Sequence, residues 1–212
     1  SRFPRLFRDI ARNDDERTLI SCLAPPGAVS SYDTPMFVPD CSAGKYPKWI
    51  AFFGAVFSSF LFDFAIRPVV DKHIKGYTLA RVSWPSPDLL VQGQIDLDWF
   101  VSRMTELVYV SEGFAPFAQD CGWSGPPFRW DEERRFLLRC ELDAAFFHLY
   151  LPAESNGDWR KVEGETDEDV ARLKASFSTP RDAVAYIMDT FPIVKRRDEE
   201  KYGTYCTKDT IL

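Results

Sequence analysis

The chain has 212 residues, of which 45% are hydrophobic and 27% are charged, as in an ordinary globular protein. This composition excludes intrinsic disorder, collagen-like repetition and a coiled coil. The net charge is −6, and residues 1–100 hold 11 basic and 11 acidic residues while residues 101–212 hold 15 and 21. The chain therefore lacks the basic footprint of a non-specific nucleic-acid coat protein, and we expect any anion-facing surface in the first half.

The five cysteines are odd in number and widely spaced, and no two of them form a Cys-x-x-Cys pair. This usage argues against a zinc knuckle and against the disulfide framework of a secreted protein, so it predicts a reducing cytoplasm. No export signal is visible at the N-terminus. Because the chain starts without Met and ends at Leu212 without a polar tail, we interpret it as a piece of a larger protein.

The most apolar window covers residues 49–66. A membrane span needs about 20 nearly uninterrupted apolar residues, and Gly54, Ser58, Ser59 and Asp63 interrupt this one. The window therefore favours a helix buried in a protein core, ended by Pro68.

Short runs rich in β-branched and aromatic residues precede this window, at 7–11 and 18–23, and a Pro-Pro-Gly turn follows them. They predict two strands. A further alternating run at 77–82, typical of extended backbone, leads to a segment at 84–87 with two prolines. These prolines indicate a boundary or a loop exit.

The second half has helical periodicity at 96–110 and 131–151, and capping signals predict a short helix at 181–189. Residues 153–169 are polar and predict a solvated insertion without a core of its own. The predicted fold class is α+β. We expect a mixed α/β domain over residues 1–90, followed by a mainly helical domain over residues 91–212 that carries the insertion.

Catalytic signatures are weak. His73 and His148 are the only histidines, no spacing suits a metal, and no phosphate-cradling glycine motif occurs. His148 lies on the predicted helix at 131–151 and is expected to be packed in the core. Adjacent acids on arginine-rich helices are typical of ion-paired surfaces. We therefore predict no catalytic residue, no metal and no cofactor in this chain.

The segment from 67 to 82 combines cations with a glycine, an aromatic ring and a hydroxyl. Lysine and arginine neutralise phosphates or donate to guanine edges, and tyrosine and threonine contact the backbone or thymine methyl groups. A basic loop on a solvated surface has the same composition, so both interpretations stay open. The candidate residues are Arg67, Lys72, His73, Lys75, Tyr77, Thr78 and Arg81.

Several stretches together resemble the C-terminal part of large adenine-specific DNA methyltransferases of type IIG-like restriction-modification and phage-defence systems. The resemblance covers nearly the whole chain and is most specific in its C-terminal blocks. The matching segments are RLFRDIA at 5–11, SFLFDF at 59–64, KGYTL at 75–79, PPFRW at 126–130, ELDAAFF at 141–147 and YIMDTFPIV at 186–194.

The resemblance implies a target recognition domain that reads double-stranded DNA. Methyl transfer from S-adenosylmethionine would belong to an upstream catalytic domain of the same parent chain, with an Asn-Pro-Pro-Tyr-type motif. That motif is absent here, because Ala24 and Gly125 precede the two Pro-Pro pairs. The fragment is therefore expected to bind no methyl donor and to catalyse nothing alone. The parent would be a cytoplasmic methyltransferase, with or without endonuclease activity, and with no membrane partner.

In this hypothesis the residues of the 67–82 segment approach the duplex, while Lys45 and Lys48 hold phosphates from a neighbouring loop. A different hypothesis is an acidic interaction scaffold whose second half docks another domain or subunit of a defence complex. An exposed apolar patch on the helix at 131–151 would favour the scaffold. The resemblance assigns structural roles to Arg8, Asp9, Arg17, Arg134, Arg135, Glu141 and Asp143.

Overall fold

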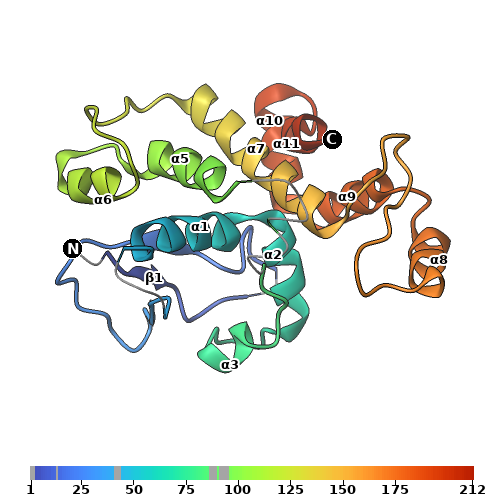
Figure 1. The fold of residues 1–212 in the computed structure, drawn as a ribbon, viewed down its shortest axis with the longest axis horizontal. Helices are drawn as coiled ribbons and strands as arrows, with labels where there is room; N and C mark the ends of the chain where they lie inside the picture. Colours follow the sequence, from blue (N-terminus) through green and yellow to red (C-terminus); the bar gives the residue numbers. More distant parts are fainter. Residues whose placement is uncertain (1–2, 13, 41–43, 86–89, 91–95) are drawn as a thin grey trace.

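The structure is a computed structural model that describes residues 3–12, 14–40, 44–85, 90 and 96–212. It confirms the α+β class: helices surround a small antiparallel sheet with strand order β2-β1-β3 (Figure 1). The predicted strands at 7–11 and 18–23 exist but are shorter and shifted, and the third was not predicted. The strands are β1 (Arg5–Phe7), β2 (Ser21–Leu23) and β3 (Met36–Phe37).

The apolar window forms two helices, α1 (Tyr46–Ser58) and α2 (Phe60–Ile66), followed by the 3-10 turn η1 (Arg67–Val69). The single predicted helix is therefore wrong. Ser59 has extended backbone, and its hydroxyl accepts a hydrogen bond from the Phe62 N–H at 3.2 Å, which starts a new helix.

The break at Ser59 also affects whether the apolar window could cross a membrane as one helix. Among the described residues, no single helix is long and apolar enough to cross a membrane. The pair made of α1 and α2 with η1 passes by length and composition, but it is bent by 67°. Most residues of this pair are buried against the rest of the chain, as in the core helices of many proteins.

The predicted helices at 96–110, 131–151 and 181–189 are confirmed by α5 (Leu97–Val108), α7 (Glu132–Tyr150) and α9 (Pro180–Asp189). The run at 77–82 was expected to be extended, but it contains the helical turn α3. The Thr78 hydroxyl accepts a hydrogen bond from the Lys75 N–H at 3.3 Å and so supports the first turn. The remaining helices are α3 (Gly76–Leu79), α5 (Leu97–Val108), η2 (Glu112–Phe114), α6 (Ala115–Asp120), α7 (Glu132–Tyr150), α8 (Asp167–Ser176), α9 (Pro180–Asp189), α10 (Pro192–Tyr202) and α11 (Cys206–Ile211).

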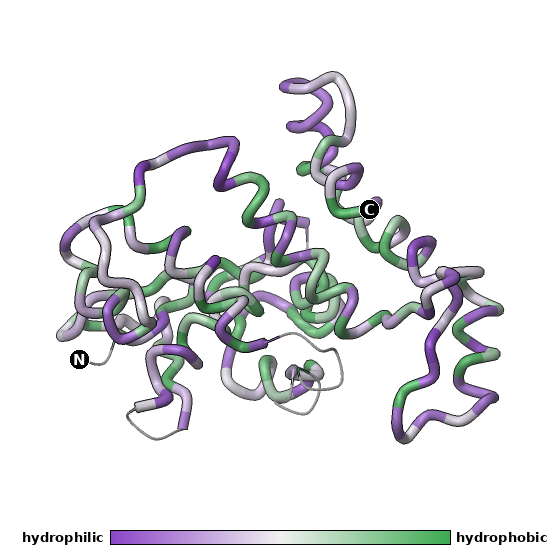
Figure 2. The backbone as a smooth tube through the Cα atoms, turned by 45° about the horizontal axis from the view of Figure 1, so that its top comes forward, coloured by the Kyte–Doolittle hydropathy of each residue, from purple (hydrophilic) through white to green (hydrophobic). Residues whose placement is uncertain are grey.

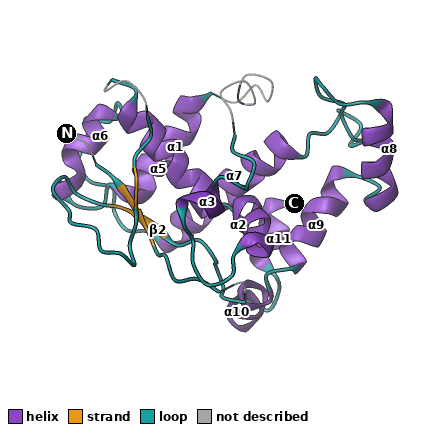
Figure 3. Cartoon of the chain, turned by 90° about the horizontal axis from the view of Figure 1, so that it is seen from below, coloured by secondary structure: helices purple, strands orange, loops and turns teal. Residues whose placement is uncertain are grey.

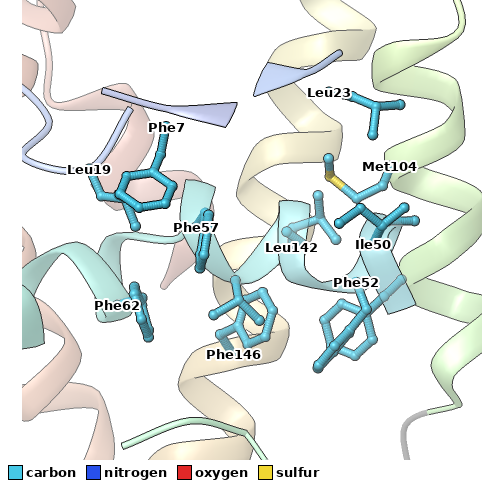
Figure 4. Close-up of a cluster of buried hydrophobic side chains, with 14 of the residues drawn as sticks. Phe7, Leu19, Leu23, Ile50, Phe52, Phe57, Phe62, Met104, Leu142 and Phe146 are labelled. Carbon is cyan, nitrogen blue, oxygen red and sulfur yellow. The ribbon is translucent and has the colours of Figure 1, made fainter. Parts of the chain in front are cut away.

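Helix α7 packs into two hydrophobic cores. Leu142 and Phe146 belong to the first core, with β1, α1 and α5, whereas Cys140 and Phe147 belong to the second, with α9, α10 and α11. Figure 4 shows the first core around α1. His148 is exposed, so its predicted packing is wrong, because it lies on the remaining solvent face of α7.

The first core joins residues from both sides of position 90. The Phe52 ring lies 5.2 Å from the Phe100 ring, and the Phe100 ring lies 4.9 Å from the Phe146 ring, centroid to centroid. Figure 3 shows the strands and α1 next to α5. The division of the chain near residue 90 stays a prediction, and any such division has to cut through this core.

The polar insertion has an anchor that was not expected. Trp159 is buried, and its indole N–H donates to the Phe177 carbonyl at 2.9 Å. Around it the chain is mostly hydrophilic, as the purple tube in Figure 2 shows for the loop before α8. One buried side chain therefore anchors the insertion, and Trp159 belongs to neither of the two hydrophobic cores.

Helix α9 begins with the capping arrangement that the sequence predicts. The Thr179 hydroxyl accepts from the Asp182 N–H at 3.2 Å, and Asp182 accepts from the Thr179 N–H at 2.9 Å. We expect Thr179→Ala to lower the free energy of unfolding by about 1 kcal/mol in urea denaturation. The exposed neighbour Ser178 makes no described contact, so Ser178→Ala is the control. Equal stability of the two variants would contradict the capping role.

Candidate nucleic-acid interface

The basic segment after α2 is fixed to the N-terminal strand region. The Ala11 N–H donates to the Lys72 carbonyl at 3.0 Å, and the Ile74 N–H donates to the Asp9 carbonyl at 2.8 Å. Ile10 and His73 form the isolated antiparallel bridge between the two segments. These contacts tie residues 72–74 of the basic segment to residues 9–11, which directly follow β1.

Asp9 is the side chain that anchors this segment. Its carboxylate is fully buried, and one oxygen, Oδ2, lies 2.8 Å from both Lys75 Nζ and His73 Nδ1. Burial alone would raise the pKa of Asp9, but the hydrogen bonds from Lys75 and His73 outweigh it and hold this pKa below its usual value. The Asp9 charge is matched by Lys75, so neither charge is free for a ligand.

Two tyrosines flank the anchored lysine. Lys75 Nζ lies 3.8 Å from the centroid of the Tyr32 ring, and this contact is a cation–π interaction. Tyr32 is 79% exposed and Tyr77 is 69% exposed. Sequence reasoning missed Tyr32, which sits in a polar loop without a helical or strand pattern. Sequence reasoning also did not predict a role for Asp9 at this site, although two charged residues, Arg8 and Asp9, lie within the predicted strand at 7–11.

Lys72 and Arg81 are the cations of this segment whose charges remain available. Both are exposed, and within the described residues neither side chain makes a hydrogen bond, an ion pair or a cation–π contact. Tyr77 lies on the short helix α3 between them, at the edge of the molecule in Figure 1. We call Lys72, Tyr77 and Arg81 the α3 surface.

The side chains of Arg67 and Thr78 make contacts inside the fold. The Arg67 guanidinium pairs with Asp63 at 3.0 Å, donates to the carbonyls of Asp15 and Glu16, and stacks over Phe191 at 4.2 Å. Thr78 is buried and supports α3. Both side chains therefore lie within the fold: Arg67 contacts residues outside α3, and Thr78 lies on the buried side of α3, next to the exposed Tyr77.

Lys45 and Lys48 come from the start of α1. Lys45 is exposed at the N-terminal boundary of the helix. The Lys48 ammonium pairs with Asp98 on α5 at 2.6 Å, and this hydrogen bond raises the pKa of Lys48. Its charge is therefore matched within the chain, so of the two lysines Lys45 has the more available charge.

In the part of the chain that the structure describes, no group of three or more His, Cys, Asp or Glu side chains is placed to hold a metal ion. The cysteines described there, Cys22, Cys121, Cys140 and Cys206, are free thiols. Burial raises the pKa of Cys121 and of Cys140 to about 12, so both are protonated at neutral pH and unsuited to nucleophilic chemistry.

Comparison with known proteins adds no further assignment, because no family model, curated protein or solved structure matches the chain.

Proposed function

We propose that this chain is a DNA recognition module that contacts duplex DNA through the α3 surface. The observation that carries the proposal is that one anchored segment, residues 72–81, holds two exposed cations without described partners, Lys72 and Arg81, and an exposed Tyr77 between them in the sequence. Cations without internal partners can neutralise phosphates and release counterions. An exposed ring adds contacts to sugar or base.

The anchor at Asp9 supports this proposal through preorganisation. A segment that is already ordered loses less conformational entropy when it binds than a free loop does. Lys75 and His73 serve here by holding the backbone through Asp9, and Lys72 and Arg81 provide the charge. The proposal thus divides the predicted site residues into anchoring residues and contacting residues.

The resemblance to adenine-specific methyltransferases supplies the rest of the proposal. In that setting, a catalytic domain of the parent chain would bind S-adenosylmethionine and transfer the methyl group, and this module would position the duplex. Sequence discrimination would come from base contacts, each of about 1 to 3 kcal/mol, and phosphate contacts would add affinity without sequence information.

The test is binding of the purified chain to a randomised duplex pool at physiological salt. We expect Lys72→Ala/Arg81→Ala to weaken binding roughly tenfold or more, because two phosphate-neutralising charges are lost. Neither side chain has a described internal partner, so the variant should keep its fold, which circular dichroism checks. Lys75→Ala is a poor choice, since it would leave the buried Asp9 carboxylate without its lysine.

The matched control is Arg129→Ala/Arg196→Ala. These arginines are also exposed, and neither has a described hydrogen bond or ion pair, so the control changes the net charge equally. A general electrostatic effect would weaken binding by the same factor in both double variants. That result would remove the α3 surface from the proposed site.

A second candidate function is the interaction scaffold, and one observation favours it. Trp130 is 61% exposed and Leu137 is 41% exposed, one just before α7 and the other on it. Aromatic side chains such as tryptophan are enriched at protein interfaces. If the wild-type chain binds no duplex even at low salt, the scaffold becomes the better account.

A further inference from the structure

A cavity of about 370 Å³ lies between the sheet and helices α1, α5 and α7. This volume is within the usual range of small-molecule sites. Leu23, Met104 and Leu142 line it from β2, α5 and α7, and Figure 4 shows them close to α1. Three arginines also line it: Arg5, Arg135 and Arg139. We call it the arginine cavity.

Arg5 is a buried cation without an anionic partner. Its side chain is 2% exposed, and its Nη1 donates to the Ser21 hydroxyl at 3.1 Å. Its Nε and Nη2 have no hydrogen-bond partner, and no described carboxylate forms an ion pair with it. Burial lowers the pKa of Arg5 to about 10, so the group stays charged at neutral pH.

A glycine makes room for this guanidinium. A Cβ added at Gly54 on α1 would lie closer than 3.0 Å to both Arg5 Nη2 and Arg5 Cζ. The close approach of Arg5 to the α1 backbone therefore requires glycine at this position or a displaced arginine. Glycine at position 54 therefore leaves space for the buried Arg5 guanidinium beside α1.

The other two arginines have no carboxylate partner either. Arg135 donates through Nη1 to the Leu107 carbonyl at 2.8 Å and stacks over Trp130, but its Nε has no partner. Arg139 is exposed and makes no ion pair with any residue that the structure describes. Asp143 is the one acid among the described lining residues, and its carboxylate accepts from the Phe60 N–H at 2.6 Å.

A buried charge without a partner is costly, and an anion that binds beside it removes this cost. We propose that the arginine cavity binds a small organic oxyanion, a carboxylate or phosphate group carried on a compact apolar body. Arginine forks fit the planar oxygens of both groups. The apolar part of the ligand would pack against the hydrophobic wall, formed by Leu23, Met104, Leu107, Val108, Phe114 and Leu142.

A neighbouring cavity of about 450 Å³ shares Arg139 and Asp143 but differs in charge balance. Its lining includes Glu16 and Asp198, and Glu16 pairs with Arg197. Its acids therefore match much of its positive charge. Of these two cavities, the arginine cavity has the larger excess of arginine over acid, and its lining does not include the α3 surface, so this proposal is independent of DNA binding.

The test is calorimetric titration of the purified chain with phenyl phosphate, inorganic phosphate and phenol, at constant ionic strength. We expect phenyl phosphate to bind with at least tenfold higher affinity than either of the other two, because only it has both the oxyanion and the apolar body. If phenol or inorganic phosphate binds as tightly as phenyl phosphate, the proposed ligand class is wrong.

Two variants locate the site. Arg139→Ala should weaken phenyl phosphate binding at least tenfold, while Arg129→Ala, outside the cavity, and Lys72→Ala/Arg81→Ala leave it unchanged. Arg5→Met should abolish phenyl phosphate binding but leave the unliganded chain folded with an unchanged or higher melting temperature, because it removes a buried unpaired charge. Equal weakening by Arg139→Ala and Arg129→Ala, or full binding by Arg5→Met, would overturn the assignment.

Discussion

Asp63→Ala should lower the free energy of unfolding by about 3 to 5 kcal/mol, because it breaks a buried ionic network. The Asp63 carboxylate is fully buried and accepts from the Thr18 N–H at 3.0 Å and from Arg67 Nε at 3.0 Å, with Arg17 Nε at 3.5 Å. Without it, two largely buried guanidinium groups lose their carboxylate partner, and the Thr18 N–H loses its acceptor. Urea denaturation at equilibrium measures the change.

The control for this prediction is Asp14→Ala. Asp14 forms an ion pair with Arg12 at 2.7 Å in which both side chains are more than 60% exposed, and such exposed pairs contribute little to stability. If the Asp63 variant is no less stable than the Asp14 variant, Arg67 is not held by a buried network. Its assignment to the fold, away from DNA, would then lose its basis.

The second large effect concerns pH. Asp143 is buried, and burial raises its pKa to about 7, against the opposing effects of Arg17, the Phe60 N–H and Arg139. Between about pH 4 and pH 7 the folded chain keeps a proton that the unfolded chain has lost. The free energy of unfolding should therefore fall as pH rises through this window, and the contribution of Asp143 should be constant above it.

Asp143→Asn isolates this contribution, since its amide oxygen can still accept from the Phe60 N–H and it does not titrate. A shift of three pKa units corresponds to roughly 4 kcal/mol. We expect the two proteins to be similarly stable at pH 4 and the variant to be more stable at pH 8 by up to about 4 kcal/mol. A stability difference that stays constant from pH 4 to pH 8 would show that the Asp143 pKa is not raised.

Local patterns predicted α5, α7 and α9, but they did not predict α6, α8, α10 or α11. The caps at Asp131 and Thr179 and the apolar spacing of α5 and α7 are contained within a few residues, so the sequence alone indicates them. The break between α1 and α2 was harder, because Ser59 caps the second helix while its flanks are uniformly apolar. The burial of Trp159 depends on the Phe177 carbonyl, 18 residues away, and no local pattern indicates such a contact.

In the candidate sites, too, local sequence patterns do not indicate contacts between residues that are far apart in the sequence. Composition identified the basic segment, but it could not separate Lys72 and Arg81, whose charges are available, from Arg67 and Lys75, which pair with buried acids. These pairings depend on tertiary contacts. The arginine cavity could not be predicted either, because Arg5 and Arg139 are far apart in the sequence and meet only through the packing of α7 beside the sheet.

The most direct test of the central claim is the salt dependence of duplex binding by the wild-type chain and by Lys72→Ala/Arg81→Ala. Each phosphate contact contributes about 0.9 to the slope of log Kobs against log salt concentration. We predict a steep wild-type slope whose magnitude decreases by about 2 in the variant, and no decrease in Arg129→Ala/Arg196→Ala. A slope that is the same in all three proteins would contradict DNA binding through the α3 surface.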